Sequence, residues 1–351
     1  MPNAHPLVIA LMTGALLSLP VLAQESAVTP PAVQGTPGRV IGGKMSSHPD
    51  WFKESFLDIT EDVKEASETG KHLILIMEMN GCPYCAKMIE ENFKTVPYRD
   101  FIQEKFDVIA LNVHGDREVA IDADTSMTEK ALAGHLGVTY TPTLLFLNAA
   151  NEPVARVNGY RNVADFKRVL DYVAAKAYEE RTLAEFLAAE PVEGRYAFRA
   201  DSRIQVIDDL SGVTDKPLAI LFEDAACTAC DALHDGHLAD PKVDAALKDL
   251  VLTRLDARSD APITAPDGSK TTARQLAEDL GIGYRPTLVL YDQGREIARI
   301  ESQLYRYHFI GLLEYVGQRH YRKYPDSPFD YINAKTAELT AAGKDVSIAD
   351  D

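Results

Sequence analysis

The chain has only four cysteines in 351 residues. All four occur in two Cys-x-x-Cys pairs, Cys82 with Cys85 and Cys227 with Cys230, so no cysteine is left over for an ordinary structural bridge. A disulfide across two intervening residues closes too small a loop to stabilise a fold much through chain entropy. The spacing does let one sulfur attack or resolve a disulfide on the other, so we expect exchange chemistry at both pairs.

The chain also lacks a basic patch. It carries 53 acidic and 36 basic side chains, which gives a formal net charge of -17. This balance argues against binding to nucleic acid or to anionic membrane surfaces. We therefore expect no nucleic-acid partner and interpret the acidity as a solubility feature.

The first 23 residues contain no Lys, Arg, Asp or Glu, and residues 7–23 form an apolar run. The run is too short and too weakly flanked for a stable membrane span, and it ends in the small-residue pattern of a signal-peptidase site, Val21-Leu22-Ala23. We predict a signal peptide over residues 1–23 and a periplasmic location, with an uncleaved N-terminal anchor as the alternative. Residues 24–45 are rich in Pro, Gly, Ala and Ser and predict a flexible leader.

The chain matches itself at an offset of about 144 residues. Cys82 falls on Cys227, Glu78 falls on Glu223, and residues 137–144 fall on residues 281–288. This ordered series predicts an internal duplication. We place a first domain at residues 46–185, a linker at 186–204 with breaks at Glu190-Pro191 and Glu193-Gly194, a second domain at 205–335 and a C-terminal tail at 336–351.

Each half shows the same order of elements. An apolar strand (73–77; 218–222) leads to the Cys-x-x-Cys pair, which opens a helix. Further strands are predicted at 108–113, 142–147 and 154–157, matched by 250–255, 286–291 and 297–300. Helices are predicted at 128–136 and 163–177, matched by 272–280 and 308–320. Strands alternating with helices predict an α/β fold with a central sheet in each half.

At the first pair, Cys82 lies just before the predicted helix, where unpaired backbone N–H groups and the helix dipole favour a thiolate. Pro83 fits the first helical turn, and Lys87 adds a positive charge nearby. We therefore expect Cys82 to be the exposed nucleophile and Cys85 the buried resolving thiol.

Two further elements accompany this pair. The step Thr141-Pro142 predicts a cis peptide bond beside the cysteines, with the Thr141 backbone free to pair with an extended substrate; the alternative is an ordinary trans proline. Glu78, four residues before Cys82, is a candidate for proton transfer to or from Cys85. It could equally be a solvated residue at a strand end.

The second pair has different neighbours. Asp224 and Asp231 flank it, and their negative charge is expected to raise the pKa of Cys227. Arg285, before Pro286, could offset that charge. His234 is predicted to face inward, and it joins Glu223 as a candidate for proton transfer.

A metal site is the alternative at this pair. Cys230, His234 and His237 follow one another at helical spacing, and with Cys227 they could form a Cys2His2 zinc shell. We expect instead that Cys227 and Cys230 form a redox pair with a buried histidine beside it and bind no metal.

The first half contains four diagnostic segments: Trp51-Phe52, Gly81-Cys82-Pro83-Tyr84-Cys85-Ala86-Lys87-Met88, Tyr140-Thr141-Pro142-Thr143 and Gly159-Tyr160. On these residues it resembles the periplasmic thioredoxins of the SoxW type, relatives of the C-terminal domain of the membrane disulfide reductase DsbD in the thioredoxin-like superfamily. The resemblance covers about residues 46–185, and it extends to about 205–325 as a diverged copy. In that copy the glycine that matches Gly159 is missing, because the segment reads Glu301-Ser302-Gln303-Leu304-Tyr305.

The resemblance implies two tandem thioredoxin-like domains, each a central mixed β-sheet flanked by helices. It implies that Cys82 attacks and Cys85 resolves, and that a membrane transporter of the DsbD or CcdA kind delivers electrons. No diffusible cofactor is expected. The residues expected to contact substrate are Tyr84, Thr141, Pro142, Arg285 and Pro286.

The resulting hypothesis is an exported thiol–disulfide oxidoreductase that acts on protein or small-molecule disulfides as a reductase. One alternative is a disulfide oxidase or isomerase. Another is a partner-binding or zinc-binding protein whose second domain is not redox active.

Overall fold

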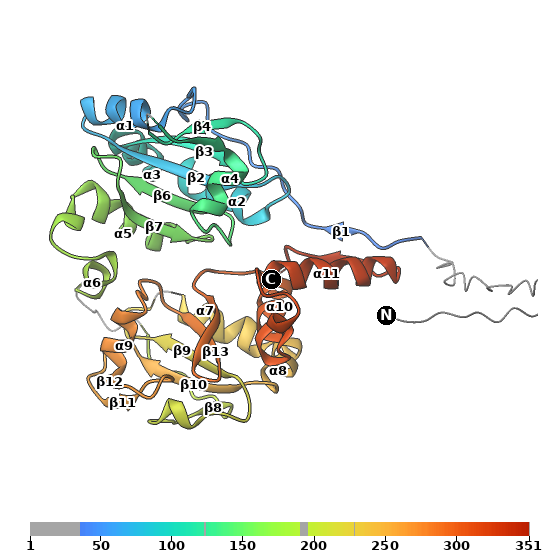
Figure 1. The fold of residues 1–351 in the computed structure, drawn as a ribbon. Coiled ribbons are helices and arrows are strands. Elements are labelled where there is room, and N and C mark those ends of the chain that lie inside the picture. The colour runs from blue at the N-terminus through green and yellow to red at the C-terminus, as the bar shows by residue number, and fades with distance from the viewer. Residues whose placement is uncertain (1–35, 123, 190–195, 228, 351) are drawn as a thin grey trace, which may run out of the picture. The chain divides into compact units, whose positions relative to one another are not determined.

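The computed structural model describes residues 36–122, 124–189, 196–227 and 229–350, and it shows two successive α/β domains (Figure 1). The predicted signal peptide lies outside the described residues. Among the residues described, no helix is both long and apolar enough to cross a membrane.

The first domain is built on a four-stranded mixed sheet with the order β3-β2-β6-β7. Strand β2 (His72–Glu78) pairs in parallel with β3 (Phe106–Asn112) and antiparallel with β6 (Thr143–Leu147), which pairs with β7 (Pro153–Asn158). The two central strands are buried along almost their whole length, which agrees with their nearly uninterrupted apolar sequences.

Helices cover both faces of this sheet. They are α1 (Ile59–Glu68), α2 (Pro83–Met88), α3 (Tyr98–Lys105), α4 (Glu129–His135) and α5 (Val163–Ala174). Alternate residues of β2 point to opposite faces: Ile74 packs in the cluster that holds Phe166 of α5, whereas Leu75 packs in the cluster that holds Val63 of α1. A π-helical turn (Ile89–Phe93) follows α2, and a small hairpin of β4 (Glu118–Ala120) and β5 (Ser126–Thr128) precedes α4.

The second domain repeats this plan and adds an edge strand. Its sheet has the order β14-β13-β9-β10-β8. The strands are β8 (Ile204–Gln205), β9 (Leu218–Glu223), β10 (Val251–Asp256), β13 (Thr287–Asp292) and β14 (Arg295–Ile300). The helices are α7 (Cys230–Asp235), α8 (Pro241–Leu247), α9 (Ala273–Asp279), α10 (Arg306–Gly317) and α11 (Pro328–Ala341), and a hairpin of β11 (Pro262–Thr264) and β12 (Lys270–Thr272) precedes α9.

The chain outside the two domains is more regular than its composition predicts. Residues 36–45 of the predicted flexible leader contain β1 (Val40–Ile41), which pairs in parallel with β15 (Val346–Ser347) of the predicted tail. The predicted boundary at residue 335 falls inside α11. The β1–β15 pairing was not predicted because its backbone partners lie about 300 residues apart, as in the 2.8 Å bond from Val346 N to Arg39 O, and local composition carries no trace of them. Helix α11 does carry a local start signal, with Ser327 as its N-cap and Pro328 in its first turn.

The predicted linker at 186–204 also needs correction. Helix α6 (Leu183–Ala188) crosses its first boundary, and β8 begins at its last residue. Thr182 and Glu185 form a capping box that starts α6, a signal that was present in the sequence. The two predicted breaks at 190–194 lie outside the described residues.

Candidate redox sites

The first cysteine pair lies between the end of β2 and the start of α2. Cys82 and Cys85 form a disulfide, and their Cα atoms are 5.3 Å apart. Cys82 is the N-cap of α2: its Sγ accepts a hydrogen bond from the backbone N–H of Cys85 at 3.0 Å, and Pro83 occupies the first turn. The N-terminus of α2 therefore points its N–H groups at the sulfur that is expected to become a thiolate.

This pair is less accessible than the sequence predicts. Cys82 is only 4% exposed and Cys85 1%, so the expectation of an exposed nucleophile differs from the structure. Part of the reason is that the N-terminal segment crosses the loop before the pair, where Lys44 N donates to Gly81 O at 3.3 Å. Tyr84, in the first turn of α2, is also buried.

The proline loop lies beside Cys82, as predicted. The Thr141–Pro142 peptide bond is cis. The Thr141 hydroxyl lies 3.5 Å and the Thr141 carbonyl oxygen 3.6 Å from Cys82 Sγ. Two segments 59 residues apart in the sequence thus form one site.

Glu78 and Lys87 have other partners than the cysteines. The Glu78 carboxylate accepts a hydrogen bond of 2.6 Å from His48 Nε2, and the Glu78 side chain is 12% exposed. The Lys87 ammonium lies 4.7 Å from the centre of the Tyr160 ring and 5.8 Å from that of Tyr305. Lys87 is thus held by aromatic faces at the edge of the site.

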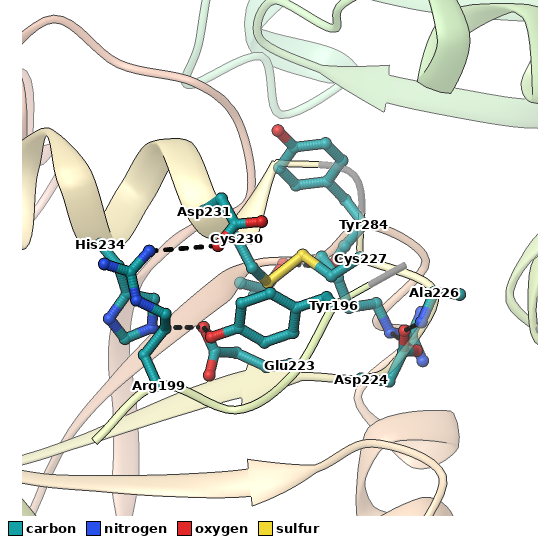
Figure 2. Close-up of a disulfide and its surroundings, with 12 residues drawn as sticks. Tyr196, Arg199, Glu223, Asp224, Ala226, Cys227, Cys230, Asp231, His234 and Tyr284 are labelled. Carbon is teal, nitrogen blue, oxygen red and sulfur yellow. Dashed lines mark hydrogen bonds and ion pairs between the residues drawn. A yellow bond between two sulfur atoms is a disulfide. The ribbon is translucent and has the colours of Figure 1, made fainter. Parts of the chain in front are cut away.

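The second pair occupies the matching position after β9 (Figure 2). Cys227 and Cys230 form a disulfide with a Cα–Cα distance of 5.6 Å, and the ring of Tyr196 packs against both cysteines. Helix α7 begins only at Cys230 and its N-cap, Ala229, has no side-chain hydrogen bond. Cys227 therefore lacks the N-cap position that Cys82 holds.

Glu223 is the most enclosed carboxylate of this site, with no exposed surface. It accepts hydrogen bonds from His234 Nε2 at 2.8 Å and from the Tyr196 hydroxyl at 3.1 Å (Figure 2). Arg254 lies 3.6 Å away. Burial and the nearby Glu223 charge raise the pKa of Tyr196 to about 12, so this hydroxyl remains a donor at neutral pH. The prediction that His234 faces inward is confirmed.

The acidic residues around the second pair do not leave it negatively charged. Asp224 pairs with Arg285 at 3.1 Å and with Arg258 at 3.3 Å, and Asp231 pairs with Arg199 at 3.2 Å. Arginines thus compensate both acids, and the expectation that the pKa of Cys227 is raised stays a prediction. Arg285 offsets Asp224 as predicted, and it follows the cis Arg285–Pro286 bond.

The zinc alternative rested on one continuous helix, and that premise is wrong. Helix α7 ends at Asp235, and His237 lies in a separate 3-10 turn (His237–Ala239), where its Nε2 contacts Leu304 O at 2.6 Å. His234 is engaged with Glu223. No group of three potential metal-ligating side chains occurs in the part of the chain that the structure describes.

Four residues near the two sites were missed by sequence reasoning. Tyr196 lies in the predicted linker, and Arg254 lies on a strand whose register was needed to place it beside Glu223. The other two residues, Tyr305 and His308, belong to the second domain and contact Tyr84 of the first. Their contacts are long-range, so no local pattern identifies them.

The chain belongs to the thioredoxin-like family. A model of the thioredoxin-like domain matches residues 59–174 and 209–317, together well over half of the chain. No curated protein matches it significantly. With two such domains, each holding a cysteine pair within disulfide distance, the chain is a thiol oxidoreductase at the general level.

Solved structures with this fold are also similar to the chain. A thioredoxin-fold protein from Helicobacter pylori is 23% identical, with 36% of this chain and 86% of that chain covered and a TM-score of 0.30. A thioredoxin from Thermus thermophilus is 24% identical, with 38% and 90% covered and a TM-score of 0.29. The first two thioredoxin domains of Saccharomyces cerevisiae Eps1p are 13% identical, with 70% and 89% covered and a TM-score of 0.24.

Proposed function

We propose that the chain is an exported, periplasmic thiol–disulfide oxidoreductase of the SoxW type with a diverged second copy of its domain. It acts as a reductase on the disulfides of proteins or small molecules. A membrane transporter of the DsbD or CcdA kind supplies its electrons. The observation that carries the exchange activity is the placement of Cys82 Sγ at the start of α2 and within 3.6 Å of the Thr141 carbonyl oxygen.

In the reduced chain, the Cys82 thiolate attacks one sulfur of a substrate disulfide and releases the other as a thiolate. The N–H groups at the start of α2 stabilise the Cys82 thiolate, as the 3.0 Å bond from Cys85 N indicates. Cys85 then loses its proton and attacks Cys82 Sγ, which frees the second substrate thiol and forms the Cys82–Cys85 disulfide. Two electrons pass from the chain to the substrate, and the membrane donor restores both thiols.

Substrate docking in this proposal uses the loop beside Cys82. Tyr84 flanks the pair, and Thr141 offers its backbone next to Pro142. In the second domain, Arg285 and Pro286 take the corresponding place.

The second domain serves as an electron relay or as a specialised site. Glu223 and His234 are proposed to move the proton of Cys230, since both are buried next to the disulfide and are hydrogen-bonded to each other. Glu78 has the corresponding role at Cys85. Its contact with His48 gives it a route to solvent.

The experiment that tests the proposal is the reduction potential of each pair. The chain is equilibrated with glutathione or dithiothreitol, alkylated and analysed by peptide mass spectrometry. A potential near or below roughly -230 mV for Cys82 and Cys85 supports a reductase, and a value between roughly -180 and -120 mV supports an oxidase or isomerase instead. If Cys227 and Cys230 never form a disulfide while the first pair titrates, the second domain is a binding module.

A further inference from the structure

The face of the first domain that is proposed to dock substrate is covered by the second domain. The Tyr84 hydroxyl contacts His308 Nδ1 at 2.7 Å and accepts a hydrogen bond of 2.9 Å from Tyr305 N. The rings of Tyr84 and Tyr305 lie 4.9 Å apart. A residue of the Cys-x-x-Cys loop is thus held by the segment that joins β14 to α10.

The same segment also covers the other edge of the docking face. Asn158, at the end of β7, donates from Nδ2 to Glu301 Oε1 at 2.7 Å. Gly159 lies so close to Ser302 that a Cβ on this glycine would be 2.5 Å from the serine Oγ. Residues 301–305 therefore cross from the end of β7 to the start of α2.

The contact is nearly reciprocal between the two domains. Ser302 takes the place in the second domain that Gly159 takes in the first, and these two residues touch each other. Likewise, Tyr140 donates to Arg299 O at 2.7 Å, while its counterpart Tyr284 lies 4.3 Å under the Arg161 guanidinium. Two repeats that meet through the same surface form an interface like that of a symmetric dimer.

A cavity of about 270 Å³ remains beside this contact. Its wall includes Tyr84 and Lys87 of the first domain and Ala229, Pro286 and Tyr305 of the second. None of the cysteines is among the residues that line it. The backbone of a docked polypeptide would overlap residues 301–305, which occupy the face between the end of β7 and Tyr84.

We propose that residues 301–308 are an internal occupant of the docking groove of the first domain, so that the structure is a closed state. This inference rests on the proposed function, and it adds that the chain discriminates between small and protein disulfides by size. The closed chain excludes protein disulfides from Cys82 more strongly than small ones, because a docked polypeptide needs the groove that the segment occupies. Protein substrates dock only when the segment leaves the groove.

The test compares small and large thiol reagents on the reduced full chain. Cys82 is alkylated with N-ethylmaleimide or with a maleimide that carries a long polyethylene glycol chain, so that both reagents have the same reactive group, and peptide mass spectrometry gives the rate at Cys82. Glu301→Lys removes the bond to Asn158, and Ser302→Trp cannot fit against Gly159. Each is expected to raise the ratio of large-reagent to small-reagent rates about tenfold over the parent.

Glu278→Lys is the matched control, because Glu278 is an exposed residue of α9 in the same domain and undergoes the same charge change. It is expected to leave the ratio unchanged. Equal rates for both reagents in the parent, or a ratio that neither groove variant changes, would overturn the inference. If circular dichroism shows that the Ser302→Trp variant does not fold, the ratio measured for Glu301→Lys alone decides the test.

The readout separates this inference from the proposed function. Alkylation reports the cover over Cys82 even if the pair never exchanges with a disulfide. Conversely, measured redox potentials can support the reductase while an unchanged alkylation ratio removes the closed state.

Discussion

The two cysteine pairs occupy the same place in two copies of one fold, yet their surroundings differ. Cys82 caps a helix that begins at the next residue, whereas the helix of the second pair begins at Cys230. The acid four residues before each pair differs as well. Glu78 keeps contact with solvent and bonds to His48, whereas Glu223 is fully enclosed among His234, Tyr196 and Arg254.

The difference shows that the same residue at matching positions of the two domains can have a different environment in each. A carboxylate at the edge of a sheet needs little support, because water solvates its charge. A carboxylate without exposed surface must be paired and hydrogen-bonded, because losing its hydration costs several kcal/mol. The second site accordingly holds Glu223 in a network of hydrogen bonds, whereas the first site has a cysteine at the N-cap of its helix.

The largest expected effect separates the two pairs by activity. Cys82→Ala removes the proposed attacking thiolate and is expected to lower the rate with a small aromatic disulfide about a thousandfold. Cys227→Ala is expected to keep the rate within about threefold of the parent, because Cys82 and Cys85 both remain in that variant. Stopped-flow absorbance measures both variants. Comparable losses in both would mean that electrons must pass through the second pair.

The next effect separates the two glutamates by stability. Glu223→Gln leaves Arg254 in the site without a charged partner, and we expect a loss of about 3 kcal/mol in the free energy of unfolding. Glu78→Gln is the matched change at the first site, with an expected loss below about 1 kcal/mol. Urea titration of the oxidised chain followed by circular dichroism gives both values. Equal losses would show that the burial of Glu223 does not set its contribution.

The third effect concerns His308, the histidine of α10 that contacts Tyr84 of the first site. Burial lowers the pKa of His308 to about 4, from an ordinary value of 6.5. The unfolded chain thus takes up a proton near pH 6.5 that the folded chain accepts only near pH 4, so stability is present above pH 6.5 and is lost as the pH falls towards 4. The full loss would be up to about 3 kcal/mol.

His308→Gln removes this titration, so the fall in unfolding free energy between pH 6.5 and 4 should be shallower in the variant than in the parent. The matched control is His135→Gln on the exposed surface of α4, which should keep the slope of the parent. Urea titrations at a series of pH values provide the slopes. Parallel curves for His308→Gln and the parent would contradict a buried, neutral His308.

Much of each domain could be predicted because its signals are local. Thr128 and Thr272 cap α4 and α9 at the residues where the pattern predicts helices to begin, and the apolar runs predict β2 and β9 within a residue of their bounds. The connecting hairpins β4–β5 and β11–β12 were missed, because their short polar strands carry no strong alternation. Pairing between β1 and β15 could not be predicted, since neither strand has a local partner.

The site was predictable in its parts but not in its electrostatics. The sequence alone identified both cysteine pairs, the cis proline beside Cys82 and an inward-facing His234, because spacing and backbone restrictions determine them. Only the tertiary structure decided that Asp231 pairs with Arg199, that Tyr196 closes over the second disulfide and that the segment at 301–308 lies on Tyr84. Burial and charge pairing depend on which distant segments meet, and that is settled by the packing of the whole chain.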